Sequence, residues 1–286
     1  MDKPRKSGLV VLVGRSNVGK STLLNSLIGT KIAIATPKPQ TTRNVIQGVL
    51  HDARGQIVFV DTPGIFKQVP DQLTAKLNEK ARDALEGVDV VLYVVDPARH
   101  VGDEEEAVHR MVKQLKIPKI LVLNKADQKR PYIDEYMAWR DEFTAIVDVS
   151  ALSNKGLKPL VDAVIEALPE GGVDLYPPDQ ITNVENKFWL EELIREKVFM
   201  GLHEEIPYST TVRVDEVARR EEGTVYIKAS VLTTATRYKK MIIGAGASKI
   251  RGIGRAARKE LELVTGDKIY LDLDVQVEER WQERFE

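Results

Sequence analysis

The pattern of apolar positions changes near residue 170 and divides the chain into two parts. In the first part, short apolar runs alternate with segments of helical periodicity, and the runs 90–95 and 120–123 are apolar at every position. Unbroken runs of this kind are typical of parallel strands buried on both faces. The pattern therefore predicts an α/β fold with a doubly wound mixed sheet. The expected strands are 9–13, 45–50, 57–60, 88–95, 119–123 and 145–149, and the expected helices are 20–28, 73–86, 103–115, 132–143 and 157–168.

The second part begins after a segment rich in proline and glycine, which is typical of a linker. In the predicted strand 224–232, apolar residues occupy every second position, which indicates a sheet with one buried face. This part is expected to be a smaller α+β domain with helices on one face of its sheet. We place the first domain at 1–170, the linker at 171–182 and the second domain at 183–286. The expected order is helix 187–203, strand 210–219, strand 224–232, helix 237–243, helix 249–264 and strand 268–277.

Composition excludes several classes of protein. The chain of 286 residues has no cysteine, so a disulfide framework is impossible, and a reducing cytoplasm is the expected location. No stretch reaches the roughly 18 consecutive apolar residues of a membrane-spanning helix. The net charge of -1 argues against a chain that binds nucleic acid over its whole surface. Residues 237–259, however, contain eight Lys or Arg and no Asp or Glu, which favours phosphate binding; the alternative is a solvated helix face.

A phosphate-binding loop follows the first predicted strand. The sequence GRSNVGKS, residues 14–21, matches the pattern G-x-x-x-x-G-K-[ST] and leads into a predicted helix. Gly14 and Gly19 permit a tight turn that brings backbone N–H groups to phosphate oxygens. Lys20 is expected to lie between the β- and γ-phosphates. A glycine-rich turn without a ligand is the alternative, and the two motifs described next argue against it.

The sequence DTPG, residues 61–64, follows the predicted strand 57–60. Magnesium prefers a few oxygen ligands from the protein, together with phosphates and waters. We expect the Ser21 hydroxyl to be one ligand, with Asp61 supporting the ion from the second shell, and Gly64 to offer its N–H to the γ-phosphate. The loop 31–45 is expected to switch between order and disorder, with Thr42, preferred narrowly over Thr41, binding magnesium when GTP is present. A solvated polar loop is the alternative.

The sequence NKAD, residues 124–127, follows the apolar strand 119–123 and indicates guanine. The Asp127 carboxylate can accept two hydrogen bonds from the guanine edge, whereas adenine offers no such pair of donors. Ser150 and Ala151 follow the last predicted strand, where a backbone N–H can reach the guanine carbonyl. A charged helix start is the alternative. The residues expected to contact the nucleotide are Gly14, Asn17, Val18, Gly19, Lys20, Ser21, Thr22, Asp61, Gly64, Asn124, Lys125, Asp127, Ser150 and Ala151.

Ile65 stands where many small GTPases have a glutamine that orients the attacking water. Slow hydrolysis is therefore expected. The Asn17 carbonyl is a candidate ligand for a monovalent cation such as potassium, which would offset charge in the transition state; loop stabilisation is the alternative. The groups expected to act in hydrolysis are Lys20, Thr42, Gly64 and Asn17.

These motifs together resemble the Era family of bacterial GTPases. The resemblance extends from GRSNVGKSTLLN at 14–25 and PQTTR at 39–43 to IREK at 194–197, IPYS at 206–209, IRGIG at 250–254 and ARK at 257–259. It implies a KH domain of type II in the order α-β-β-α-α-β, which clamps single-stranded RNA with a GxxG loop. It also implies GTP, GDP and Mg²⁺ as ligands, and binding near the 3′ end of small-subunit ribosomal RNA during assembly of the small ribosomal subunit. Peripheral contact with the inner membrane is implied as well, and we expect a monomer.

The sequence departs from the family at two positions. Ser16 replaces the usual proline of the phosphate-binding loop, and Ala247 replaces the last glycine of the clamp loop 244–247, which reads GAGA. The second departure affects the expected RNA site. The residues expected to contact RNA are Lys239, Lys240, Ile243, Gly244, Ala245, Gly246, Ala247, Lys249, Ile250, Arg251 and Arg255.

Two other interpretations remain to be separated from a GTP-driven RNA-binding switch. One is an RNA-binding protein whose nucleotide is structural and essentially unhydrolysed, which Ile65 favours. The other is a GTPase of RNA modification or membrane traffic, against which the basic clamp argues. Elsewhere, Glu104, Glu105 and Glu106 are expected to form a solvated helix N-terminus, and the four histidines lack the spacing of metal ligands.

Overall fold

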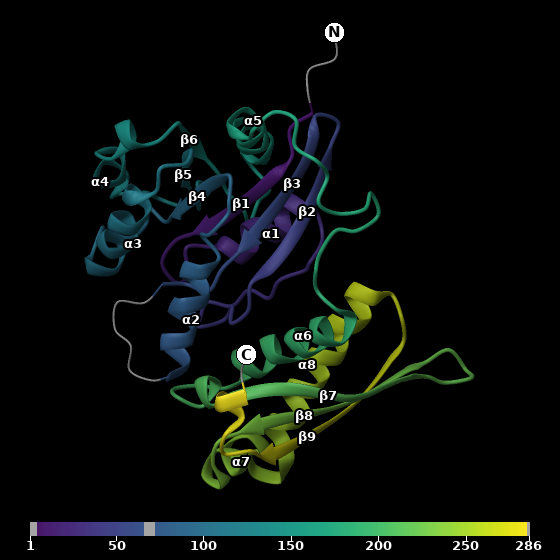
Figure 1. Ribbon diagram of the computed structural model, residues 1–286. Coiled ribbons are helices and arrows are strands. Elements are labelled where there is room, and N and C mark those ends of the chain that lie inside the picture. The colour runs from purple at the N-terminus through teal and green to yellow at the C-terminus, as the bar shows by residue number, and fades with distance from the viewer. Residues whose placement is uncertain (1–4, 66–71, 285–286) are drawn as a thin grey trace. The chain divides into compact units, whose positions relative to one another are not determined.

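The computed structural model describes residues 5–65 and 72–284. It separates into two compact units, Met1–Asn183 and Val184–Glu286. The first unit contains a six-stranded sheet in the order β2-β3-β1-β4-β5-β6 (Figure 1). Among these six strands of the described residues, β2 and β3 pair antiparallel and the other neighbours pair parallel, so the sheet is mixed, as predicted. Its strands are β1 Gly8–Val13, β2 Ile46–Asp52, β3 Gly55–Asp61, β4 Val90–Val95, β5 Lys119–Leu123 and β6 Ala145–Asp148.

Helices connect the parallel strands of this unit. They are α1 Lys20–Ile28, α2 Gln72–Asp83, α3 Asp103–Gln114, α4 Ile133–Met137 and α5 Leu157–Ala167, with a 3₁₀ turn, η1, at Arg140–Glu142. The carboxyl ends of β1, β3, β5 and β6 lie at one edge of the sheet, because these strands are parallel. The sequences GRSNVGKS, DTPG and NKAD and the pair Ser150 and Ala151 each lie at one of these four ends, whereas the loop 31–45, which carries Thr42, follows helix α1.

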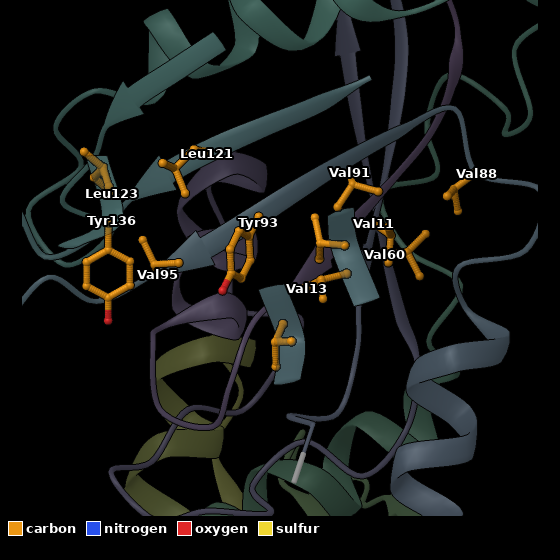
Figure 2. Close-up of a cluster of buried hydrophobic side chains, with 12 residues drawn as sticks. Val11, Val13, Val60, Val88, Val91, Tyr93, Val95, Leu121, Leu123 and Tyr136 are labelled. Atoms are coloured by element: carbon orange, nitrogen blue, oxygen red, sulfur yellow. The ribbon is translucent and has the colours of Figure 1, made fainter. Parts of the chain in front are cut away.

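The core of the first unit is built from branched side chains that fill both faces of the central strands. Every residue of β3 and of β4 is buried. One cluster joins valines of β1 and β4, leucines of β5, and two tyrosines, Tyr93 and Tyr136 (Figure 2). The phenol rings lie among the aliphatic side chains, and both hydroxyls are directed to the same side of the cluster. Close packing of this kind fixes the strand ends from which the loops emerge.

The second unit has the order α-β-β-α-α-β that the sequence predicts. Its three-stranded sheet has the order β7-β8-β9, with β7 and β8 antiparallel and β8 and β9 parallel. Apolar residues of the first and last helices, such as Ile194 and Leu261, pack with Val231 and other residues of the sheet into a buried core. The elements are α6 Asn186–Gly201, β7 Thr210–Arg219, β8 Val225–Thr233, α7 Thr236–Ile243, α8 Ser248–Thr265 and β9 Ile269–Val277, with 3₁₀ turns η2 Pro207–Ser209, η3 Ala245–Ala247 and η4 Trp281–Arg284.

The expected helix 132–143 is interrupted. It is helical over Ile133–Met137 and then tightens to a 3₁₀ turn at Arg140–Glu142. At the break, the Trp139 ring stacks on the His109 ring of α3 with their centroids 3.8 Å apart. Glu142 then accepts a hydrogen bond from Lys113 of α3 at 2.9 Å. These contacts with a neighbouring helix accompany the departure from regular helical geometry.

The segment expected to be a linker belongs to the first unit and lies along the edge strand β2. The N–H of Val49 donates to the carbonyl of Ile181 at 2.8 Å, and Thr182 Oγ1 donates to the Gln47 carbonyl at 2.7 Å. The buried amide of Gln56 donates to the carbonyl of Tyr176 at 2.8 Å. The segment is therefore ordered by hydrogen bonds to β2 and β3. Across the described residues, no helix is both long and apolar enough to cross a membrane.

Candidate functional site

The phosphate-binding loop needs both glycines of its motif. A Cβ at Gly14 would lie 2.3 Å from the Val94 carbonyl oxygen, so β4 leaves no room for a side chain. Gly19 has φ +96°, a left-handed conformation, and a Cβ there would lie 2.5 Å from Asn124 Nδ2. The loop therefore packs closely against β4 and against Asn124 of the NKAD motif, directly before helix α1 begins.

Lys20 is buried at the start of α1 and is held across the loop. Its Nζ donates to the carbonyl of Gly14 at 2.9 Å and to that of Arg15 at 3.1 Å. Burial lowers the pKa of Lys20, while the negative charges of Asp61 and Glu105 oppose that shift. Lys20 lines a cavity of about 60 Å³ together with Asn17, Ser21, Thr42 and Gly64.

Three oxygen-bearing side chains meet in this cavity wall. Ser21 Oγ donates to Asp61 Oδ2 at 2.5 Å and lies 2.8 Å from Thr42 Oγ1. Thr41 instead donates to the carbonyl of Lys38 at 2.7 Å and lies 2.6 Å from Thr36 Oγ1. The structure therefore separates the two threonines that the sequence barely distinguishes, since only Thr42 joins Ser21.

These oxygens fit a magnesium ion. Asp61 is fully buried, and in the part of the chain that the structure describes its Oδ1 atom has no hydrogen-bond partner. Burial raises the pKa of Asp61 to about 6, even though Lys20 and the Ser21 hydroxyl favour the ionised form. A buried carboxylate with an unpaired oxygen beside two hydroxyls matches the hard oxygen ligands that magnesium prefers.

The NKAD motif connects the loops around a second cavity. Asn124 Nδ2 donates to the Val18 carbonyl at 2.8 Å, and Asn124 Oδ1 accepts from the Ala151 N–H at 3.1 Å. In this structure the N–H of Ala151, one of the two residues expected near the guanine carbonyl, is therefore engaged by Asn124. Lys125 adopts φ +59° and forms an ion pair of 2.6 Å with Asp96. A non-glycine residue in this conformation is strained, and such strain is concentrated at functional sites.

Asp127 is exposed and oriented by Ser150, whose hydroxyl donates to Asp127 Oδ1. That hydrogen bond lowers the pKa of Asp127 and keeps its carboxylate charged. The cavity beside it measures about 170 Å³ and is lined by Thr22, Asn124, Lys125, Asp127 and Ala151, among others. It shares Gly19 and Thr22 with the cavity at Lys20, so the two form neighbouring parts of one site.

The loop after β3 approaches the phosphate-binding loop closely. A Cβ at Gly64 would lie 3.0 Å from Ser16 Cα, and the backbone of Ile65 pairs with that of Arg15 as an isolated parallel β-bridge. Asn17 has φ +65°, and its Nδ2 donates to the carbonyl of Pro37 in the loop 31–45 at 2.8 Å. The Asn17 amide thus connects the phosphate-binding loop to the expected switch loop.

The prediction of three solvated glutamates at the start of α3 was wrong for one of them. Glu105 is fully buried, whereas Glu106 is exposed. Glu105 forms an ion pair of 2.7 Å with Arg15 and accepts from the Tyr93 hydroxyl at 2.6 Å. Helical periodicity places Glu105 on the same face of α3 as the buried residues Val108 and Val112, a signal that the expectation of three solvated glutamates overlooked. Arg15 itself was missed because it occupies a variable position of the loop motif.

The basic segment of the second unit carries the expected clamp loop. Gly244 has φ +73° and ψ 172°, and a Cβ there would lie 2.9 Å from the Lys249 Cβ. Gly246 and Ala247 both adopt left-handed conformations, with φ +54° and φ +60°. Ala247 therefore does occupy a position that favours glycine. Arg251 donates to the Gly246 carbonyl at 2.5 Å and thereby stabilises the loop.

A groove of about 560 Å³ begins beside this loop, between α8 and β9. It brings together Ile250, Arg251 and Arg255, which the sequence predicts as RNA contacts. Leu271 and Leu273 from β9 form its apolar side and were not predicted, since their pattern indicates only a strand. Within the described ranges, the structure shows no ion pair for the predicted contacts Lys239, Lys240, Lys249 or Arg255. Ala245 is exposed and Ile243 is partly buried at the end of α7.

Comparison with known proteins agrees with both units. A family described as "50S ribosome-binding GTPase" matches residues 9–125, and one described as "KH domain" matches residues 205–282. The GTPase Era of Halothermothrix orenii is 41% identical over 98% of this chain and 95% of that protein. The GTPase Era of Trichlorobacter lovleyi is 43% identical over 99% of this chain and 96% of that protein. The chain belongs to the Era family of GTPases.

Solved structures of Era share the fold of this family member. Era in complex with MgGDPNP and nucleotides 1506–1542 of 16S ribosomal RNA has a TM-score of 0.90 and 37% identity, covering 98% of this chain and 96% of that chain. A variant of Aquifex aeolicus Era bound to GDP·AlF₄⁻ has a TM-score of 0.90 and 38% identity, with the same coverage. The similarity includes the GTPase unit and the KH unit in one chain.

Proposed function

We propose that this chain is a GTP-hydrolysing switch that binds small-subunit ribosomal RNA near its 3′ end and assists assembly of the small ribosomal subunit. The observation that carries the proposal is the likeness, over 98% of the chain, to an Era bound to both MgGDPNP and a 16S ribosomal RNA segment. A likeness to proteins that resemble this chain in the GTPase domain alone would not explain the presence of the second unit. We expect it to act as a monomer in the cytoplasm, with peripheral contact at the inner membrane.

In this proposal, the cavity at Lys20 receives the phosphates and the cavity at Asp127 receives guanine. Lys20 exchanges its bonds to the Gly14 and Arg15 carbonyls for phosphate oxygens, while Ser21 and Thr42, supported by Asp61, hold Mg²⁺. The ion, when bound, neutralises charge on the β- and γ-phosphates. Asp127, held in its charged form by Ser150, accepts hydrogen bonds from guanine and rejects adenine.

Hydrolysis depends on groups other than residue 65, because the Ile65 side chain cannot orient water. Gly64 lies against Ser16 and offers its backbone to the γ-phosphate. Asn17 donates its amide N–H to Pro37, and we assign its carbonyl oxygen to a potassium ion beside the phosphates. The same hydrogen bond links this position to the loop that carries Thr42, so the nucleotide state and the order of that loop are coupled.

RNA binding is assigned to the clamp loop 244–247 and the groove beside it. The exposed cations of α7 and α8 attract the RNA backbone in a salt-dependent manner. The apolar side formed by Leu271 and Leu273 offers a surface for bases, as KH domains use with single-stranded RNA. The competing function, an RNA-binding protein with a structural nucleotide, has only Ile65 in its favour.

The experiment measures RNA affinity in two nucleotide states. A single-stranded RNA with the 3′-terminal sequence of small-subunit ribosomal RNA is titrated with protein bound to GDPNP or to GDP, and a scrambled RNA serves as the control. A switch predicts tighter binding of the 3′-terminal RNA in one nucleotide state. The Lys249→Gln/Arg255→Gln variant should weaken binding and flatten the salt dependence. Equal affinity in both states would contradict a switch, and equal affinity for the scrambled RNA would contradict the proposed RNA target.

A further inference from the structure

Glu105 stands out because it is a buried glutamate in the first turn of α3, where its neighbour Glu106 is exposed. Its two oxygens have separate partners. Oε1 accepts from the Tyr93 hydroxyl at 2.6 Å, and Oε2 forms an ion pair of 2.7 Å with Arg15 Nε. Removing two charged groups from water is costly, and the loss of one partner leaves an uncompensated buried charge.

Polar groups surround the Arg15 guanidinium, although its buried Nε makes no hydrogen bond among the described residues. Its Nη2 donates to the Tyr136 hydroxyl at 3.0 Å, its Nη1 donates to the His100 carbonyl at 3.3 Å, and its Nε faces Glu105. The side chain is 5% exposed. Although Arg15 belongs to the phosphate-binding loop, its charge is therefore directed into the protein and away from the cavity that Lys20 lines.

The backbone of Arg15 lies where two loops of the nucleotide site meet. Its carbonyl accepts from Lys20 Nζ at 3.1 Å. Its backbone pairs with Ile65, and the next residue, Ser16, lies so close to Gly64 that a Cβ on that glycine would be 3.0 Å from Ser16 Cα. The contacts that fix the position of the Arg15 side chain therefore also fix the spacing between the phosphate-binding loop and the loop expected to contact the γ-phosphate.

We propose that Glu105 is a positioning residue for GTP hydrolysis, acting through Arg15 on the spacing between the phosphate-binding loop and Gly64. The inference rests on the proposed function and adds to it a residue on α3 that contacts no nucleotide. Loss of the Glu105 charge leaves the guanidinium buried without a counter-ion, and the backbone of Arg15 must move to relieve this. GDP lacks the γ-phosphate that Gly64 is expected to contact. The loss of the Glu105 charge therefore leaves the affinity for GDP unchanged but lowers the rate of GTP hydrolysis.

The test compares Glu105→Gln with the matched variant Glu106→Gln. Glutamine keeps the size of Glu105 but carries no charge, so in either orientation of its amide the buried guanidinium of Arg15 lacks a counter-ion. Glu106 lies one residue further along the same helix, is exposed, and forms an ion pair of 3.6 Å with Arg110. The measurements are kcat for GTP, the affinities for GDPNP and GDP, and the melting temperature.

We expect kcat of Glu105→Gln to fall by ~10-fold or more, since misplacement of reacting groups by about 1 Å costs up to ~10²-fold. GDPNP affinity should fall with it, GDP affinity should remain that of the wild type, and Glu106→Gln should behave as the wild type. Unchanged kcat and GDPNP affinity in Glu105→Gln would overturn the inference. An equal loss of GDP and GDPNP affinity would also overturn it, because the whole loop would then be disturbed.

A double variant, Arg15→Met/Glu105→Met, separates positioning from stability. Apolar replacements of a buried ion pair commonly restore or raise stability. The inference predicts that the melting temperature recovers while kcat stays low, and recovery of both together would overturn it. Wild-type turnover is measured alongside. If the wild type does not hydrolyse GTP, the proposed function fails, whereas the ratio of GDPNP to GDP affinity still tests the role of Glu105.

Discussion

Replacing Ala247 with glycine should stabilise the second unit. Ala247 has φ +60° and ψ 24° at the start of α8, a left-handed conformation that costs an L-residue ~1–2 kcal/mol. Glycine removes that penalty, but it also raises the conformational entropy of the unfolded chain. This second effect offsets ~0.4–1 kcal/mol of the gain in the free energy of unfolding. The net expectation is a gain of roughly 0.5–1 kcal/mol, which is ~2–8 °C in melting temperature if the second unit unfolds independently.

The matched control for Ala247→Gly is the opposite change one residue earlier. Gly246 has φ +54°, and a Cβ there would meet no atom within 4 Å, so Gly246→Ala introduces backbone strain without a clash. It should destabilise by roughly 0.5–1 kcal/mol, from the same two contributions with reversed signs. Thermal and denaturant unfolding without RNA measure both variants. The reasoning is refuted if Ala247→Gly is neutral or destabilising while Gly246→Ala destabilises as expected.

The Ala247→Gly variant should also bind single-stranded RNA several-fold more tightly. A clamp of this type brings the RNA backbone against the loop, and the alanine methyl group lies at that approach. The salt dependence of binding should not change, because no charge is altered. Weaker or unchanged RNA binding by the glycine variant, measured across a salt series, would show that the clamp accepts alanine at this position.

Three further predictions concern the nucleotide site. Asp127→Asn should weaken GTP binding and strengthen binding of xanthosine triphosphate, since an amide complements the xanthine edge; full GTP preference in the variant would contradict the assignment of guanine to Asp127. GTP hydrolysis should be faster in potassium than in sodium, and Asn17→Ala should abolish the difference; equal rates in both salts for the wild type would remove the cation role. Burial raises the pKa of Asp61 from its ordinary value of 3.8 to about 6 in the folded protein. The folded state therefore binds this proton more tightly than the unfolded state does, and the difference in the free energy of proton binding is roughly 3 kcal/mol. In protein stripped of Mg²⁺ and nucleotide, this carboxyl should therefore add stability as the pH falls from 6 towards 4, and Asp61→Asn should lack that increment; identical pH profiles of unfolding free energy would refute it.

Local patterns were sufficient for most of the fold. Strands such as Lys119–Leu123 and helices such as Lys20–Ile28 begin and end where predicted, because unbroken valine and leucine runs and glycine boundaries are local signals. The helix expected at 132–143 is interrupted where Trp139 stacks on a ring from another helix, a contact that periodicity cannot reveal. The segment expected to be a free linker has the composition of one, yet its hydrogen bonds go to Gln47 and Gln56, more than 100 residues away.

For the candidate site as well, some features could be predicted from the sequence and others could not. The motifs predicted a magnesium site at Ser21 and Asp61 and a guanine site at the NKAD motif, and both lie at one edge of the sheet because parallel strands place their carboxyl ends there. The sequence prefers Thr42 over Thr41 only narrowly, and the structure supports that preference because Thr42 lies beside Ser21. Helical spacing could have placed Glu105 on the buried face of α3 with Val108 and Val112, but its partners could not be found from the sequence, because Arg15 and the tyrosines of β4 and α4 lie on distant segments.

The most direct measurement of the central claim is multiple-turnover GTP hydrolysis with and without the 3′-terminal RNA of the small ribosomal subunit. The reaction is followed by phosphate release in potassium and Mg²⁺, with Lys20→Ala as the inactive control. The account predicts slow but repeated turnover by the wild type, changed by that RNA and not by a scrambled RNA of equal length. A wild type that releases no more phosphate than Lys20→Ala in either RNA condition would contradict it and favour a structural nucleotide.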